Sequence, residues 1–85
     1  MSYRLEMRPR ARRTLGGLPK DDARRVDSAI LSLADEPRPD GSRKLRGAGD
    51  LYRIRVGSYR VVYEIDDSIR IVVISRIGHR RDVYR

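Results

Sequence analysis

Residues 51–65 contain two runs that alternate with a period of two, Leu51-Tyr52-Arg53-Ile54-Arg55-Val56 and Tyr59-Arg60-Val61-Val62-Tyr63-Glu64-Ile65. Alternation of this kind is typical of a β-strand with one buried face. Gly57-Ser58 separates the two runs. A glycine at the first position of a two-residue loop predicts a tight hairpin with a type II′ turn.

A two-residue turn also fixes which side chains share a face of the hairpin. Arg55 then faces Arg60 across the strands, and Arg53 faces Val62, on what we call the arginine face. The other face carries the apolar and aromatic pairs, which we expect in the core: Val56 with Tyr59, Ile54 with Val61, and Tyr52 with Tyr63. Two arginines directly opposite each other repel at a cost of roughly 0.2–1 kcal/mol. A sheet that binds a polyanion has a reason to accept that cost.

The distribution of charge along the chain favours the same interpretation. The chain has 20 basic and 12 acidic residues, a net charge of +8. Residues 38–60 hold seven basic and two acidic residues, residues 76–85 hold four and one, and the remainder balances. Segregated basic charge is typical of nucleic-acid binders. The alternative is an arginine-rich composition scattered for solubility, and the uneven placement argues against it.

Length and composition indicate one domain over residues 1–85. The chain has no cysteine, which excludes disulfides and fits a cytoplasmic protein. Its single histidine, His79, excludes a histidine-rich metal site, so we expect no metal and no cofactor. No segment resembles a signal peptide or reaches membrane-spanning length, so we expect no membrane partner.

The rest of the chain predicts one strand before two helices and one strand after the hairpin. Residues 3–7 alternate and predict an edge strand. Pro9 and Pro19 can each open a helix, and Pro37 ends the second one. The apolar stripes of these helices are Ala11, Leu15 and Leu18, then Ala23, Val26, Ile30 and Leu33. The order β-α-α-β-β-β predicts an α+β fold, with both helices on one face of a mainly antiparallel sheet of about four strands.

The run from Arg70 to Ile77 predicts the last strand, after a turn that we expect to hold three residues. That turn would place Glu64 opposite Arg70, Tyr63 opposite Ile71 and Val61 opposite Val73. Continued alternation along the strand would bring further residues to the arginine face. These are Arg76, Gly78 and Arg80, together with the apolar residues Val62, Val72 and Ile74.

The order and spacing of several short motifs resemble the RelE branch of the RelE/ParE superfamily of bacterial type II toxins. Four motifs carry the resemblance, which covers nearly the whole chain: Lys44-Leu45-Arg46-Gly47, Leu51-Tyr52-Arg53-Ile54-Arg55-Val56, Gly57-Ser58-Tyr59-Arg60-Val61-Val62-Tyr63 and Ile77-Gly78-His79-Arg80-Arg81-Asp82-Val83-Tyr84-Arg85. The resemblance implies a RelE-like fold and a ribosome-dependent endoribonuclease, an mRNA interferase that cuts mRNA in the A site and so inhibits translation. It also implies a co-encoded, RelB-like antitoxin, which we expect to be acidic.

The resemblance implies a catalytic set of five residues: Arg53, Arg55, Arg60, Arg80 and Tyr84. We expect further contacts with the RNA backbone from Lys44, Arg46, Arg76 and Arg81. The sequence departs from the family in two ways. Arginines stand at strand positions where some members have lysines, and the spacing from Arg80 to Tyr84 is short. We interpret His79 as structural.

Cleavage of RNA needs no metal, because the RNA's own 2′-OH can attack the adjacent phosphorus. The products are a cyclic phosphate and a free 5′-OH. Arginines can orient the phosphate and stabilise its developing charge. Tyr84 is the candidate base or proton shuttle, and neighbouring arginines would favour its ionised form.

Two other functions fit parts of the same pattern. A ParE-like toxin of this fold would inhibit DNA gyrase without cutting nucleic acid, although the presence of Arg60, Arg80 and Tyr84 argues against it. A non-catalytic module that binds RNA or the ribosome would need the basic face alone.

Overall fold

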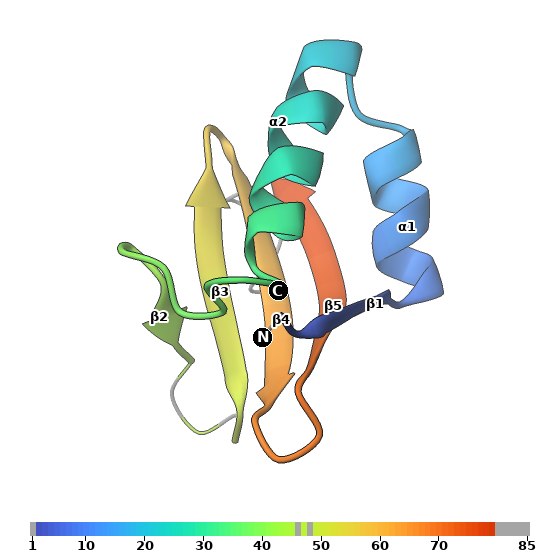
Figure 1. Cartoon of the computed structure of the whole chain (residues 1–85). Helices are drawn as coiled ribbons and strands as arrows, with labels where there is room; N and C mark the ends of the chain where they lie inside the picture. Colours follow the sequence, from blue (N-terminus) through green and yellow to red (C-terminus); the bar gives the residue numbers. More distant parts are fainter. Residues whose placement is uncertain (1, 46, 48, 80–85) are drawn as a thin grey trace.

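The computed structural model describes residues 2–45, 47 and 49–79. Its elements are β1 (Arg4–Met7), α1 (Pro9–Gly16), α2 (Lys20–Ser32), β2 (Arg43–Lys44), β3 (Leu51–Val56), β4 (Tyr59–Asp66) and β5 (Ile71–His79) (Figure 1). One sheet of five strands has the order β1-β5-β4-β3-β2. β1 runs parallel to β5, and the other neighbours are antiparallel. The predicted α+β class is confirmed, and the sheet has a short fifth strand, β2, beyond the four that the sequence predicted.

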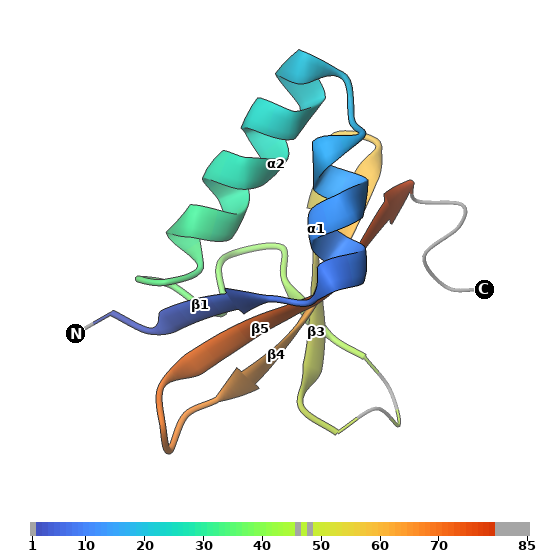
Figure 2. The same cartoon turned by 90° about the vertical axis from the view of Figure 1, so that its right-hand side faces the viewer.

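Both helices cover the same face of the sheet, as predicted (Figure 2). The core lies between the helices and the sheet, and its buried members come from both layers: Ala11, Val26, Ile30, Leu33, Ile54, Val61, Tyr63, Ile65, Val72, Ile74 and Ile77. Tyr52 and Tyr59 pack against this core while remaining partly accessible. The tyrosines of the hairpin therefore belong to the helix-covered face, and the arginine face is the other one.

The two prolines mark the helix starts, as the sequence indicates. Pro9 is the first residue of α1, where its missing N–H costs no hydrogen bond. Pro19 directly precedes α2, whose first turn carries Asp21 and Asp22. Acidic side chains are stabilised there by the helix dipole.

The register predicted for the β3–β4 hairpin is confirmed. Arg55 lies opposite Arg60, Arg53 opposite Val62, and Tyr52 opposite Tyr63. Gly57 has φ +60°, and Ser58 does not have a positive φ. This combination is that of the expected type II′ turn.

The register predicted between β4 and β5 is wrong, because the turn is longer than expected. It spans residues 67–70, and the Asp66 carboxylate closes it by accepting hydrogen bonds from the Ser68 amide and hydroxyl and from the Ile69 amide. Glu64 consequently lies opposite Val73 and not opposite Arg70.

The longer turn moves two residues from the arginine face to the core. Tyr63 lies opposite Ile74, so Val72 and Ile74 face the helices and are fully buried. Ser75 then forms a bulge, because Val62 lies opposite Arg76. One extra residue in a strand reverses which side the following residues face. Arg76 therefore lies on the arginine face, where the sequence placed it, as does Gly78 opposite Arg60.

We predict that Tyr63→Phe destabilises the fold. The buried Tyr63 hydroxyl donates a hydrogen bond to the Pro37 carbonyl oxygen at 2.8 Å, and losing it should cost about 1 kcal/mol of unfolding free energy. Burial raises the pKa of Tyr63 to about 12. A folded-state pKa above the unfolded value contributes stability that is complete below about pH 10 and is lost as pH rises towards 12.

Urea denaturation of both proteins between pH 7 and pH 11 measures this effect. The wild type should lose more stability than Tyr63→Phe over the alkaline part of the range. Tyr59→Phe is the matched control, because the Tyr59 hydroxyl bonds Asp22 near the surface, and it should cost less at pH 7. Equal stability of Tyr63→Phe and wild type at pH 7 would contradict the assigned hydrogen bond.

Candidate nucleic-acid interface

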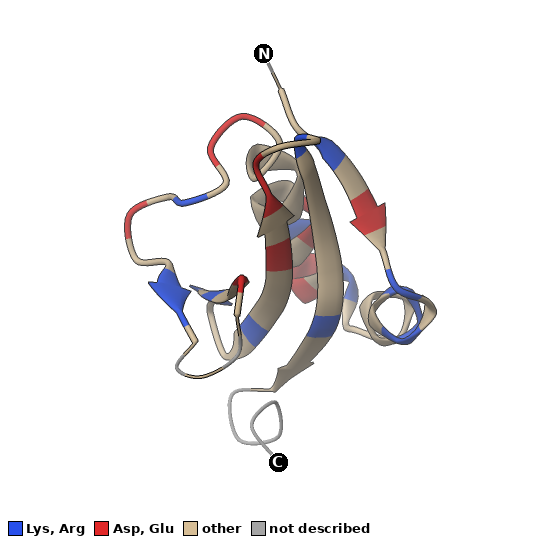
Figure 3. Cartoon of the chain, turned by 90° about the horizontal axis from the view of Figure 1, so that it is seen from below, with Lys and Arg blue, Asp and Glu red and all other residues tan. Residues whose placement is uncertain are grey.

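The arginine face consists of two rows that run across the strands β3, β4 and β5. Arg55, Arg60 and Gly78 form one row. Arg53, Val62 and Arg76 form the next row. On β4, the basic residue lies near the start of the strand and the acidic residues lie towards its end (Figure 3). Arg76 of β5 pairs with Val62, in the first half of β4. The pairing thus gathers positive charge at one end of the sheet.

The four arginines of these rows differ in accessibility. Arg55 is exposed, and Arg60 and Arg76 are half-buried. Arg53 is only 6% exposed, so the expectation that it lies on an open surface is wrong. Its Nη1 donates a hydrogen bond to the Gly41 carbonyl oxygen at 3.0 Å, from the loop that precedes β2. Strand alternation gives the face of a side chain but does not reveal a loop that covers it.

A cavity of about 320 Å³ lies beside Arg53. Its lining includes three arginines, and the full set is Asp40, Gly41, Arg43, Arg53, Ile54 and Arg55. Arg43 enters this group because β2 pairs with β3 and brings Arg43 opposite Arg53. The sequence counted the charge of Arg43 but assigned it no contact, since a two-residue strand gives no periodic signal.

A second cavity, of about 370 Å³, lies between the start of α1 and the sheet. Its lining is Arg8, Arg10, Leu51, Val62, Glu64, Ser75 and Arg76. Arg8 Nη2 lies 3.9 Å from Glu64 Oε1. Arg8 and Arg10 thereby extend the basic surface beyond the sheet. They belong to the part of the sequence whose charges balance, so composition did not reveal them.

The remaining sequence candidates are only partly described. Lys44 is exposed in β2, opposite Tyr52. Arg46, Arg80, Arg81 and Tyr84 lie outside the described residues, so their roles stay predictions. The His79 ring meets the Tyr59 ring edge-on at 5.9 Å between centroids, in line with a structural role.

No group of three His, Cys, Asp or Glu residues in the described part of the chain could hold a metal ion. No helix among the same residues is long and apolar enough to cross a membrane. The chemistry that the described part of the arginine face offers is that of guanidinium groups, which hold phosphate oxygens and stabilise developing negative charge.

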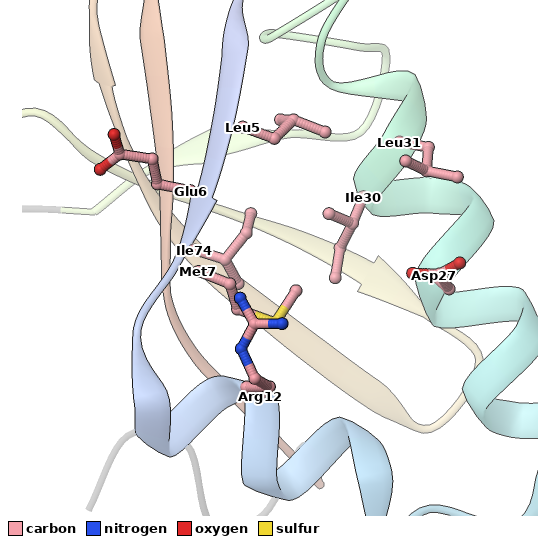
Figure 4. Close-up of a pocket in the computed structure, with 8 residues that line it drawn as sticks. All are labelled: Leu5, Glu6, Met7, Arg12, Asp27, Ile30, Leu31 and Ile74. Carbon is pink, nitrogen blue, oxygen red and sulfur yellow. The ribbon is translucent and has the colours of Figure 1, made fainter.

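Another cavity, larger than the two beside the arginine face, lies on the other side of the molecule, between β1 and α2 (Figure 4). This helix-side groove has a volume of about 500 Å³ and is lined by Leu5, Glu6, Met7, Arg12, Asp27, Ile30, Leu31 and Ile74. Leu31 is 58% exposed, unusually high for a leucine. The groove runs beside β1, an edge strand of the sheet. It is separate from the arginine face, and its lining combines five apolar residues with the charged Glu6, Arg12 and Asp27.

Comparisons with known proteins agree with this architecture. The family model described as ParE toxin of type II toxin–antitoxin system, parDE, matches residues 5–84. Toxin RelG of Mycobacterium tuberculosis is 38% identical over 86 residues, which cover 100% of this chain and 99% of that protein.

Two solved structures show the same fold. A chain of the archaeal RelE–RelB complex from Pyrococcus horikoshii has a TM-score of 0.85 and 33% identity, over 98% of this chain and 100% of that chain. The isolated Escherichia coli RelE toxin has a TM-score of 0.81 and 28% identity, over 98% of this chain and 92% of that chain. With a family model that spans nearly its whole length, the chain belongs to the ParE toxin family of type II toxin–antitoxin systems, in the RelE/ParE superfamily, as a RelE-like toxin.

Proposed function

We propose that this toxin is a ribosome-dependent endoribonuclease of the cytoplasm that cuts mRNA in the A site and so stops translation. Arg55 lies directly opposite Arg60 on a sheet face that neither helix covers, and this pair carries the proposal. Both guanidinium groups come from neighbouring strands and can donate hydrogen bonds to the oxygens of one RNA phosphate.

In the proposed reaction, the 2′-oxygen of one nucleotide attacks the adjacent phosphorus, and the bond from phosphorus to the 5′-oxygen breaks. The 2′-OH loses a proton and the leaving 5′-oxygen gains one, so the step balances without water. Arg55 and Arg60 would hold the non-bridging oxygens, where negative charge grows in the transition state. We assign Arg80 to the same phosphate and Tyr84 to the proton transfer, on the resemblance to the RelE branch. The ribosome would supply the mRNA in a fixed conformation.

Inhibition of DNA gyrase is the second candidate, because the matching family model carries the ParE name. The RelG relative and the RelE structures favour the nuclease. Mapping transcript 5′ ends after induction separates the candidates. Cuts at a fixed position within translated codons indicate the nuclease, whereas DNA damage without such cuts indicates gyrase. If neither cuts nor DNA damage are found, the remaining candidate is a module that binds RNA or the ribosome without catalysis.

We predict that Arg60→Ala and Arg80→Ala relieve growth arrest when the toxin is expressed without an antitoxin. Removing one donor to a developing oxyanion typically slows a reaction by about 10²–10³. The measurement is mRNA cleavage on programmed ribosomes, with circular dichroism to establish that each variant folds. Full toxicity of either variant would refute its place in the site.

We predict that ribosome or RNA binding weakens steeply with salt. For about five to seven phosphates on single-stranded RNA, the slope of log affinity against log salt should be roughly −3 to −5. Arg55→Gln should reduce that slope by about 0.7, the contribution of one phosphate. Lys20→Gln is the control, because Lys20 is exposed at the start of α2 in the helical layer. Equal effects of the two substitutions would exclude the arginine face as the RNA site.

We also propose an acidic, partly disordered antitoxin that folds as it binds. The Pyrococcus horikoshii structure is a complex of RelE with RelB. In this chain, the helix-side groove can take apolar side chains and the free edge of β1 can pair with an added strand, a common mode of peptide recognition. Arg12 lines the groove and is a suitable partner for an acidic residue.

We predict that Leu31→Glu weakens antitoxin binding by at least tenfold, because it removes an exposed apolar side chain from the groove and adds a carboxylate that would repel an acidic antitoxin. Isothermal titration with the co-encoded antitoxin measures the affinity. Ile69→Glu is a matched control, since Ile69 is similarly exposed at 64% but lies in the β4–β5 turn and does not line the groove. An equal loss in both variants, or no loss in Leu31→Glu, would place the antitoxin elsewhere.

A further inference from the structure

The segment of residues 37–42, between α2 and β2, is held at three points to residues of the sheet and of the β4–β5 turn. The buried Tyr63 hydroxyl bonds the Pro37 carbonyl oxygen at 2.8 Å. The Arg38 guanidinium bonds the Asp67 carboxylate in the β4–β5 turn. Arg53, on β3, donates a hydrogen bond to the Gly41 carbonyl oxygen. We call this segment the cover loop, because it lies over the buried Arg53.

The second attachment is a bidentate ion pair between Arg38 and Asp67, which are distant in the sequence; we call this pair the clasp. Arg38 donates two parallel hydrogen bonds to Asp67, Nη2 to Oδ2 at 2.9 Å and Nη1 to Oδ1 at 3.2 Å. Its Nε donates to the Tyr52 hydroxyl at 3.1 Å, and the guanidinium lies 5.0 Å from the centre of that ring. Tyr3 donates to the same carboxylate at 2.6 Å. These hydrogen bonds, that of Arg38 first, lower the pKa of Asp67 to about 2, so the clasp stays ionised near neutral pH.

Arg53 is a buried cation that lacks a counter-charge within the described residues. Neither it nor Arg43 has a carboxylate there within ion-pair distance. A guanidinium has five N–H donors, and the side chain of Arg53 uses one of its terminal nitrogens on Gly41. A buried charge is costly unless it meets an opposite one. The adjacent cavity is lined by Arg43 and Arg55 as well as Arg53, against the single carboxylate of Asp40, so its lining has a net positive charge and an anion bound there would supply the counter-charge.

We propose that Arg38 is the positioning residue of Arg53, which the resemblance places with Arg55 in the catalytic set, and that Arg43 adds a third guanidinium to the same phosphate subsite. The pair of Arg38 with Asp67 fixes the cover loop, and the Gly41 carbonyl then orients Arg53 so that its remaining donors face the cavity. Since it rests on the proposed function, the subsite takes a backbone phosphate of the substrate RNA. Free inorganic phosphate has the same chemistry and serves as a probe.

Single-turnover cleavage of mRNA on programmed ribosomes tests the positioning role. Arg38→Gln should lower the rate at saturating ribosomes at least tenfold, and so should Arg53→Gln. Because Arg38 acts through Arg53, the double variant should be no more than twofold slower than Arg53→Gln. Losses that multiply in the double variant would overturn the proposal. Arg4→Gln is the control, because it removes another exposed arginine that forms an ion pair, with Glu6 at 3.1 Å, and it should leave the rate unchanged.

A second measurement does not depend on cleavage. In nuclear magnetic resonance spectra, the Arg53 Nε–H signal should shift on titration with inorganic phosphate, and Arg38→Gln should weaken that binding at least fivefold. Asp67→Asn should weaken it similarly, which guards against an effect of one substitution on folding. The Arg38–Asp67 pair is largely exposed, so both variants should stay folded.

The two measurements separate the subsite from the reaction. Phosphate binding that depends on Arg38, in a protein that cuts no mRNA, would support the subsite and refute the nuclease. Competition by a short RNA for the Arg53 signal would identify the RNA backbone as the source of the phosphate. An Arg53 signal that responds neither to phosphate nor to Arg38→Gln would overturn the subsite.

Discussion

The pairing of β3 with β4 is the constraint on which both the core and the arginine face depend. A two-residue turn at Gly57-Ser58 leaves a single register, and that register sends Tyr63 into the core while it sets Arg55 opposite Arg60. A slip by one residue would exchange the two faces, burying charge and exposing the core. Stability and the positive surface are therefore secured by the same hydrogen bonds, and the repulsion between Arg55 and Arg60 is tolerated because the core face cannot adopt another register.

The bulge at Ser75 lets β5 serve both layers in turn. Before it, Val72 and Ile74 complete the core under the helices. After it, Arg76 and Gly78 join the arginine face. A regular strand with the observed turn would direct Arg76 towards the helices, where a charge would be costly to bury. One inserted residue thus reconciles a turn whose length is set by Asp66 with a surface that needs its arginines outside.

Local pattern in the sequence was sufficient to predict the hairpin, the helix starts and the class of the fold, because each depends on neighbours within a few residues. Turn length between β4 and β5 was not predictable in this way, since it depends on how the Asp66 side chain bonds the amides after it. The site shows the same division. Alternation placed Arg55 and Arg60 correctly, whereas the burial of Arg53 and the entry of Arg43 depend on a loop and a two-residue strand that tertiary contacts alone hold in place.

β1 pairs in parallel with β5, so Arg4 lies beside Ile71. β1 is synthesised first and β5 is synthesised last of the strands. Closing so large a loop is entropically unfavourable and slow, and it cannot begin until β5 has left the ribosome. The row of Arg53, Val62 and Arg76 on the arginine face likewise needs β5 in place, because β5 supplies Arg76. A partly synthesised chain accordingly has neither a complete sheet nor a complete basic surface. The basic surface that the proposed function requires is therefore complete only when the whole fold has formed.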